Sequence, residues 1–249
     1  MKSKLVCCVC AMLISGMAWA GGPDFDVVSS SVVTPSATGG TSRSIFIGLG
    51  YVRSWTDENK HNVDFVIGGS VGDAKKNAGL VLALANDSAD IGSDKFKNRA
   101  LSLRFNRYLS NEWSVAFGVN NLFGSGFFTG LAKSAYGVVT GSFRTRFLPV
   151  QVSLGAGTGA FHSVDDLVNR RDNKLGVFAN LGVGITKNLS IATDWNAKSL
   201  ALGVSGLVDV TPKIPVALGL GILNVAGDLQ PGAKRNTLVF TAAYAHVFK

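Results

Sequence analysis

The chain has 249 residues, of which 47% are hydrophobic and only 16% charged, and it contains 30 glycines. This length suits one barrel or one to two ordinary domains, and no internal stretch reaches the roughly 18 uninterrupted apolar residues of a membrane helix. The formal net charge of +8 is spread along the chain without a long run of one sign, which argues against a nucleic-acid partner. High apolar content without helical spans indicates strands.

Residues 1–20 have the pattern of a secretory signal peptide. Lys2 and Lys4 precede an apolar stretch that ends in the small-x-small cleavage pattern Ala18-Trp19-Ala20. All three cysteines lie within this segment: Cys7, Cys8 and Cys10. Its removal would leave 22 basic and 16 acidic residues, a net charge of +6, and no thiol. A thiol-free mature chain suits passage through an oxidising periplasm.

Residues 21–43 are rich in Ser, Thr, Gly and Pro and show no hydrophobic periodicity. We expect a flexible periplasmic N-terminal segment here. A short plug that enters a barrel lumen is the less favoured alternative. Regular structure is predicted to begin at Ser44, so that residues 44–249 form the folded unit.

From Ser44 onward, the sequence predicts an all-β protein with twelve strands, ten being the alternative count. The predicted spans are 44–55, 62–72, 79–86, 97–109, 112–122, 134–147, 150–161, 174–186, 189–197, 199–210, 214–225 and 236–248. Most connections alternate between short turns and longer polar loops, as in antiparallel up-and-down barrels of outer membranes. An even strand number places both chain ends on the short-turn, periplasmic side.

The segment 174–186, KLGVFANLGVGIT, shows the strand pattern most clearly. Leu175, Val177, Ala179, Leu181, Val183 and Ile185 alternate with Gly176, Phe178, Asn180, Gly182 and Gly184. Successive strand residues point to opposite faces, so one face is wholly apolar and the other is mostly glycine. A transmembrane barrel wall accounts for both faces, with lipid outside and a crowded lumen inside.

The last predicted strand, NTLVFTAAYAHVF at 236–248, carries Phe240, Tyr244 and Phe248 on one face. It resembles the C-terminal signal by which bacterial outer-membrane β-barrels are recognised for insertion. The resemblance implies the outer membrane of a Gram-negative cell, with membrane lipid and the barrel-assembly machinery as partners. Two aromatic belts on the predicted lipid face agree with it: Tyr51, Trp55 and Trp195 toward the loops, and Trp113, Phe147, Tyr244 and Phe248 toward the turns.

Candidate catalytic groups are sparse. The only histidines are His61, His162 and His246, and Ser163 with Asp165 and Asp166 follow one of them as loop neighbours, which makes no triad. The run 155–159, GAGTG, lacks the Lys-Ser/Thr pair of a phosphate loop. No His or Cys cluster suggests a metal. We therefore expect no enzyme activity and no cofactor.

Charged side chains are predicted to line the lumen. The alternation places Arg104, Arg144 and Arg146 inward, with Arg104 and Arg144 at similar depth. Asp64, Asp194 and Asp209 have inward parity on other strands. Excess positive charge would favour anions, whereas pairing of these charges across the lumen would close it.

These patterns predict a porin-like barrel for passive passage of small solutes, with anion preference. The alternative is a non-conducting structural or surface-interaction barrel, similar to an adhesin, whose loops bind a partner.

Overall fold

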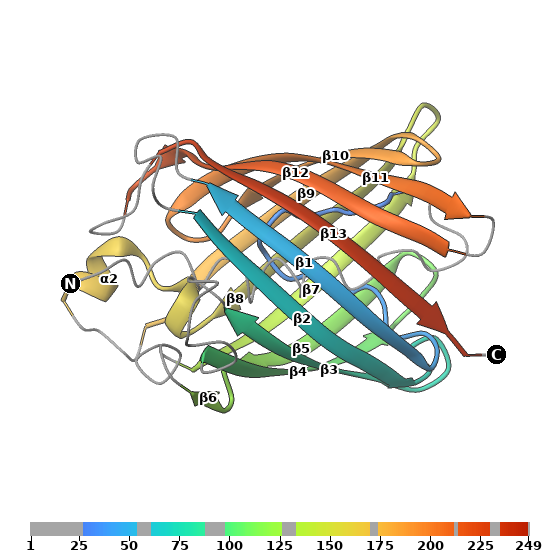
Figure 1. Cartoon of the computed structure of the whole chain (residues 1–249), viewed down its shortest axis with the longest axis horizontal. Helices are drawn as coiled ribbons and strands as arrows, with labels where there is room; N and C mark the ends of the chain where they lie inside the picture. Colours follow the sequence, from blue (N-terminus) through green and yellow to red (C-terminus); the bar gives the residue numbers. More distant parts are fainter. Residues whose placement is uncertain are drawn as a thin grey trace.

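The computed structural model describes residues 27–53, 61–87, 98–125, 133–169, 174–211, 214–229 and 235–248. They form a closed antiparallel β-barrel (Figure 1). The wall strands are β1 Ser44–Arg53, β2 His61–Gly72, β3 Gly79–Asp87, β4 Asn98–Tyr108, β5 Trp113–Asn120, β7 Ser134–Arg144, β8 Pro149–Gly157, β9 Gly176–Thr186, β10 Leu189–Trp195, β11 Ser199–Thr211, β12 Ile214–Gly227 and β13 Thr237–Val247. The short β6, Gly124–Ser125, pairs with the start of β4.

Each wall strand pairs with its neighbour in the chain, and the pairing of β1 with β13 closes the barrel. Closure leaves no unpaired edge, which a strand wall in lipid requires. The predicted up-and-down barrel of twelve strands is therefore confirmed, and the count of ten is wrong. Among the described residues, no helix is long and apolar enough to cross a membrane.

Two strand ends differ from the prediction for local reasons. The strand predicted over 134–147 ends at Arg144, because the hydroxyl of Thr145 accepts the N–H groups of Phe147 and Leu148 and forms a turn. The strand predicted over 150–161 ends at Gly157. Beyond it lie the 3₁₀ helix η2, Gly159–Phe161, and the short helix α2, Val164–Val168.

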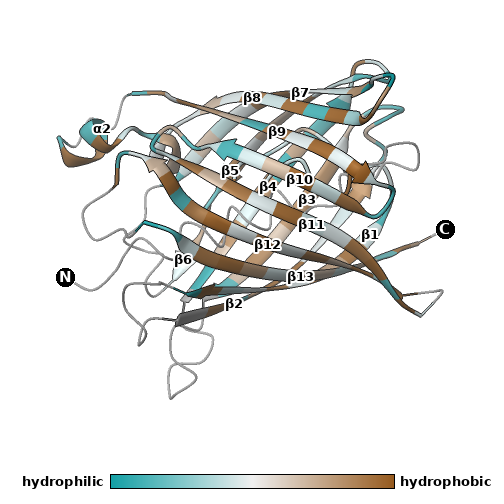
Figure 2. Ribbon diagram, turned by 90° about the horizontal axis from the view of Figure 1, so that it is seen from above, coloured by the Kyte–Doolittle hydropathy of each residue, from teal (hydrophilic) through white to brown (hydrophobic). Residues whose placement is uncertain are grey.

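Hydrophobic and more polar residues alternate along the strands (Figure 2), and many of the large apolar side chains are exposed on the outer face of the barrel. On β9, Val177 is 54% exposed on the outside, whereas the adjacent Phe178 is fully buried inside. Phe105, Phe117 and Leu154 are likewise at least half exposed on other strands. A closed barrel whose outward residues are apolar is a transmembrane barrel of the outer-membrane type.

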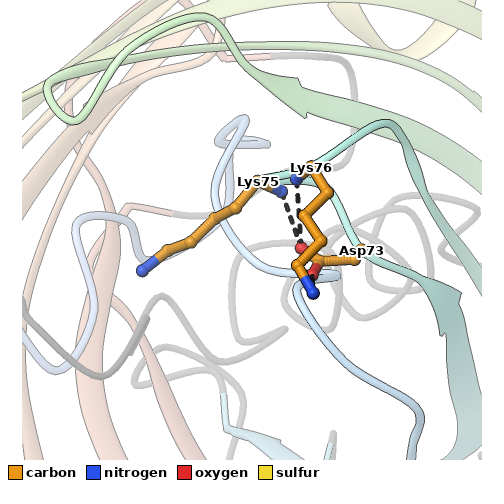
Figure 3. A network of polar contacts seen from close by, with 3 residues as sticks. All are labelled: Asp73, Lys75 and Lys76. Carbon is orange, nitrogen blue, oxygen red and sulfur yellow. Dashed lines mark hydrogen bonds and ion pairs between the residues drawn. The ribbon is translucent and has the colours of Figure 1, made fainter.

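The β2–β3 turn folds across the end of the barrel where the short turns lie (the turn end). The carboxylate of Asp73 accepts the N–H groups of Lys75 and Lys76, at 2.9 and 3.3 Å (Figure 3). Within this turn Ala74 is buried; its N–H donates to the carbonyl of Gly40, and its carbonyl accepts the N–H of Tyr108. The turn thus contacts chain that lies inside the barrel.

Candidate functional site

The N-terminal segment Val27–Gly40, called the plug below, lies inside the barrel, where Figure 1 shows it in blue. All its residues are buried except Val28, Val32 and Gly40, which are half-buried. For residues 27–40, this position corresponds to the less favoured alternative of the sequence analysis and not to the flexible periplasmic segment expected over 21–43; residues 21–26 lie outside the described residues. The expectation failed because Ser and Thr, which indicate exposure in a loop, here bond with a polar lumen wall.

The tip of the plug is held by one carboxylate of the wall. Oδ2 of Asp194 accepts the backbone N–H groups of Val32, at 2.6 Å, Val33, and Thr34, at 3.4 Å. The hydroxyl of Thr34 donates to Oδ1 at 3.3 Å, and the hydroxyl of Ser31 lies 3.2 Å from Oδ2. Asp194 is 1% exposed, so these donors take the place of water around its charge. We call this arrangement the Asp194 latch.

The second half of the plug is held by the opposite part of the wall. The guanidinium of Arg104 donates to the carbonyls of Ser36, at 3.2 Å, and Thr38, at 3.1 Å. The amide of Asn106, two residues along the same face of β4, donates to the carbonyl of Gly39. The lumen charge predicted on β4 therefore binds the backbone of the plug.

Both ends of the plug lie at the turn end of the barrel. The N–H of Val28 donates to the hydroxyl of Ser190, the second residue of β10 after a short turn. The carbonyl of Gly40 meets Ala74 in the β2–β3 turn. Asp194, at the tip, is one residue from the opposite end of β10. The plug is thus a loop that reaches into the barrel and returns.

Glycines of the wall make room for the plug. A Cβ added at Gly182 would lie 2.4 Å from Cα of Ser30. Added at Gly203 or Gly221, it would lie 2.6 or 2.7 Å from the side chain of Val32. Such distances are well inside van der Waals contact, so only glycine fits. A cavity with a volume of about 30 Å³ remains between the plug and β10–β13.

An aromatic cluster fills the lumen beside the plug. Phe161, brought inward by η2, stacks on Phe178 of β9 at 4.4 Å between ring centroids. Tyr136 of β7 meets both rings edge-on, at 5.8 and 6.3 Å. Ala37 of the plug packs against this cluster. The plug is therefore seated on an apolar surface as well as on polar groups.

The histidine and serine considered for catalysis have structural partners. Nε2 of His162 accepts the N–H of Gly159 at 3.1 Å, within the turn that carries η2. The hydroxyl of Ser163 donates to Asp166 at 2.7 Å and caps α2. In the part of the chain that the structure describes, no group of three or more His, Cys, Asp or Glu is arranged to bind a metal.

The structure separates the three predicted lumen arginines. Arg104 is buried at 4% exposure, whereas Arg144 and Arg146 are exposed at the turn end. Across the sheet, Arg104 pairs with Gly118 and Gly118 with Tyr136. Arg144 follows Tyr136 by eight residues along β7, which is about 26 Å of strand. The expectation of equal depth does not hold, because β7 ends at Arg144 and distance from a turn does not measure depth in a staggered barrel.

The predicted acids also divide. Asp64 and Asp194 are buried in the lumen, while Asp209 is exposed near the turn end of β11, opposite Pro215. On β13, Phe240 and Phe248 are 44% and 47% exposed. Tyr244 on the same strand is half-buried.

Several polar wall residues that hold the plug were not singled out from the sequence. Asn180 donates to Thr34 and to the carbonyl of Pro35, and the hydroxyl of Thr140 accepts the N–H of Ala37. Their sequence signal is a polar residue with inward parity, on a glycine-rich strand face in the case of Asn180, together with a Ser/Thr-rich segment that needs partners.

No family model and no curated protein matches the sequence. Among solved structures, the KdgM porin in complex with disordered oligogalacturonate is similar with a TM-score of 0.50 at 10% identity, over 83% of this chain and 99% of that chain. The KdgM porin alone gives 0.50 at 11% identity over the same shares. Outer membrane phospholipase A from Escherichia coli gives 0.46 at 10% identity, over 96% of this chain and 98% of that chain. The KdgM likeness is one of fold, a closed porin-like barrel.

Proposed function

We propose that this protein is a porin-like outer-membrane barrel that passes small hydrophilic solutes through its lumen, and that the plug closes the lumen in the state described. The proposal rests on the contacts by which the wall holds the plug. Among the described residues, it adds no strand to the sheet and is bound mainly by side chains of the wall. Such contacts can be exchanged for water without opening the barrel.

Many of the wall residues that bind the plug are polar, which supports a reversible closure of the lumen. Asn106, Thr140, Asn180, Ser190 and Asp194 would face water if the plug left, and water satisfies such groups. Ordering a segment costs about 1–2 kcal/mol per residue in backbone entropy, which offsets much of the gain from its contacts. The balance between a seated and a released plug is therefore small compared with the stability of the wall.

Ion preference is a finer part of the proposal. Arg104 supports a preference for anions in an open lumen, while Asp64 and Asp194 oppose it. Arg144 and Arg146 would act only at the turn end. Replacing Arg104 with Ala in a plug-deleted protein should shift the reversal potential toward cations in a salt gradient, since one positive charge leaves the lumen.

Deletion of residues 27–40 tests the channel itself. We expect the full mature chain to show rare openings in planar bilayers and the deletion variant to conduct steadily. Retained heat-dependent gel mobility would show that the barrel still folds. A folded but silent deletion variant would favour the alternative, a non-conducting structural or surface-interaction barrel, which the filled lumen also fits.

We also propose that residues 1–20, which lie outside the described residues, are a signal peptide. The barrel-assembly machinery would recognise β13. We assign no enzyme activity, because the candidate groups His162 and Ser163 serve the turn around η2 and the cap of α2.

A further inference from the structure

Exposed basic side chains gather on successive turns at the turn end of the barrel. These residues, called the basic arc, are Lys75, Lys76, Arg107, Arg144, Arg146 and Lys187. They belong to the β2–β3, β4–β5, β7–β8 and β9–β10 connections or to the strand ends beside them, and these connections follow one another around the barrel. Two acidic residues lie among them: Asp73, which is 3.9 Å from the ammonium of Lys76, and Glu112. The arc therefore carries excess positive charge.

Exposed apolar side chains lie beside these charges. Phe147 is 85% exposed at the β7–β8 turn, and the guanidinium of Arg146 lies 6.0 Å from the centre of its ring. Leu109 and Trp113, which flank the β4–β5 turn, are 63% and 44% exposed. Apolar groups next to guanidinium groups suit the boundary between acyl chains and headgroups, because the apolar groups contact acyl chains while the guanidinium groups contact headgroups and water.

The position of Arg107 sets the level of the arc relative to lipid. It follows Phe105 by two residues on the outward face of β4, and Phe105 is half exposed in the apolar band. Two strand residues span about 7 Å, so the charge lies just beyond the lipid-facing ring, at headgroup depth. A guanidinium at that depth matches phosphate, which it binds through two parallel N–H donors.

We propose that the basic arc binds the headgroups of anionic phospholipids in the leaflet at the turn end. The excess charge selects anionic over zwitterionic lipid, and the apolar neighbours insert beside the acyl chains. This binding does not depend on whether the lumen conducts.

The test uses the full mature chain in phosphatidylcholine vesicles that contain spin-labelled phosphatidylglycerol or spin-labelled phosphatidylcholine. Electron paramagnetic resonance measures how much of each label is immobilised by the barrel. We expect phosphatidylglycerol to be preferred, and the preference to weaken as salt is added. The variant R107Q/R144Q/R146Q should lower the preference by about fivefold or more.

A matched control removes exposed charge from the opposite end, at Arg53, Lys133 and Lys174 (R53Q/K133Q/K174Q). It should keep the preference, and R107K/R144K/R146K should keep most of it because the charge remains. Equal association of the two lipids with the wild-type protein would overturn the proposal. So would a preference that survives in the glutamine variant, or one that the control removes to the same extent.

Discussion

At the scale of single residues, the tip of the plug is bound by one carboxylate, that of Asp194. Three consecutive N–H groups of the plug and the hydroxyls of Ser31 and Thr34 donate to it. A hydrogen bond to a charged group contributes about 1.5–3 kcal/mol, against about 1 kcal/mol between neutral groups. Loss of this one charge should therefore weaken the closed state without disturbing the wall.

We predict that Asp194→Asn shifts the closed state toward the open one by about 2 kcal/mol, or roughly thirtyfold in open probability. Single-channel recording measures this directly. Asp209→Asn removes the same charge from an exposed position of the next strand and should leave gating unchanged. An unchanged open probability in a folded Asp194→Asn protein would show that the latch does not hold the plug.

A substitution at Gly182 tests whether close contact between the wall and the plug keeps the plug in place, and it changes no charge. A methyl group there would lie 2.4 Å from the backbone of Ser30, so we expect Gly182→Ala to displace the plug and raise conductance. Gly50→Ala is the matched control, because a methyl group at that position meets only Asp64, at 4.0 Å. Planar-bilayer recordings of both variants should differ. Equal behaviour would mean that the plug can shift past an added methyl group.

At the scale of elements, the connections divide the barrel into a turn end and a loop end. The turns after β9 and β7 are short, whereas the β8–β9 connection holds η2 and α2. The β2–β3 turn contacts the plug through Ala74. Movement of the plug and movement of this turn should therefore be linked.

Cysteine labelling of intact cells checks the orientation of these elements. We predict that a cysteine at Asn169, which caps α2 and is exposed, reacts with an impermeant maleimide, and that one at Asn188 in the β9–β10 turn does not. A cysteine at Lys234, outside the described residues, should also react. Labelling at Asn188 alone would mean that the barrel is inserted the other way.

At the scale of the whole molecule, closure of the sheet and the apolar outer face make the barrel one cooperative unit. We predict that the protein is recovered with the outer-membrane fraction and that it migrates faster in gels before boiling than after. The compact form persists in detergent because no strand edge is open to attack. Recovery in the soluble periplasm would contradict the membrane assignment.

The sequence by itself determined the wall of this barrel. Alternation with period two, as in 174–186, and the turn residues between strands are local features, so they predicted all twelve strands to within a few residues. The inward parity of Arg104, Asp64 and Asp194 followed from the same alternation.

Only the tertiary structure decided what fills the lumen and which charges meet there. The plug has no period of its own, and it is buried through contacts between distant residues, such as Ala37 with Thr140, 103 positions apart, and Val33 with Asp194, 161 apart. The stagger of neighbouring strands placed Arg144 at the turn end, far along β7 from the level of Arg104. Local patterns carry no information on either point, because both depend on how strands far apart in the chain are aligned when the barrel closes.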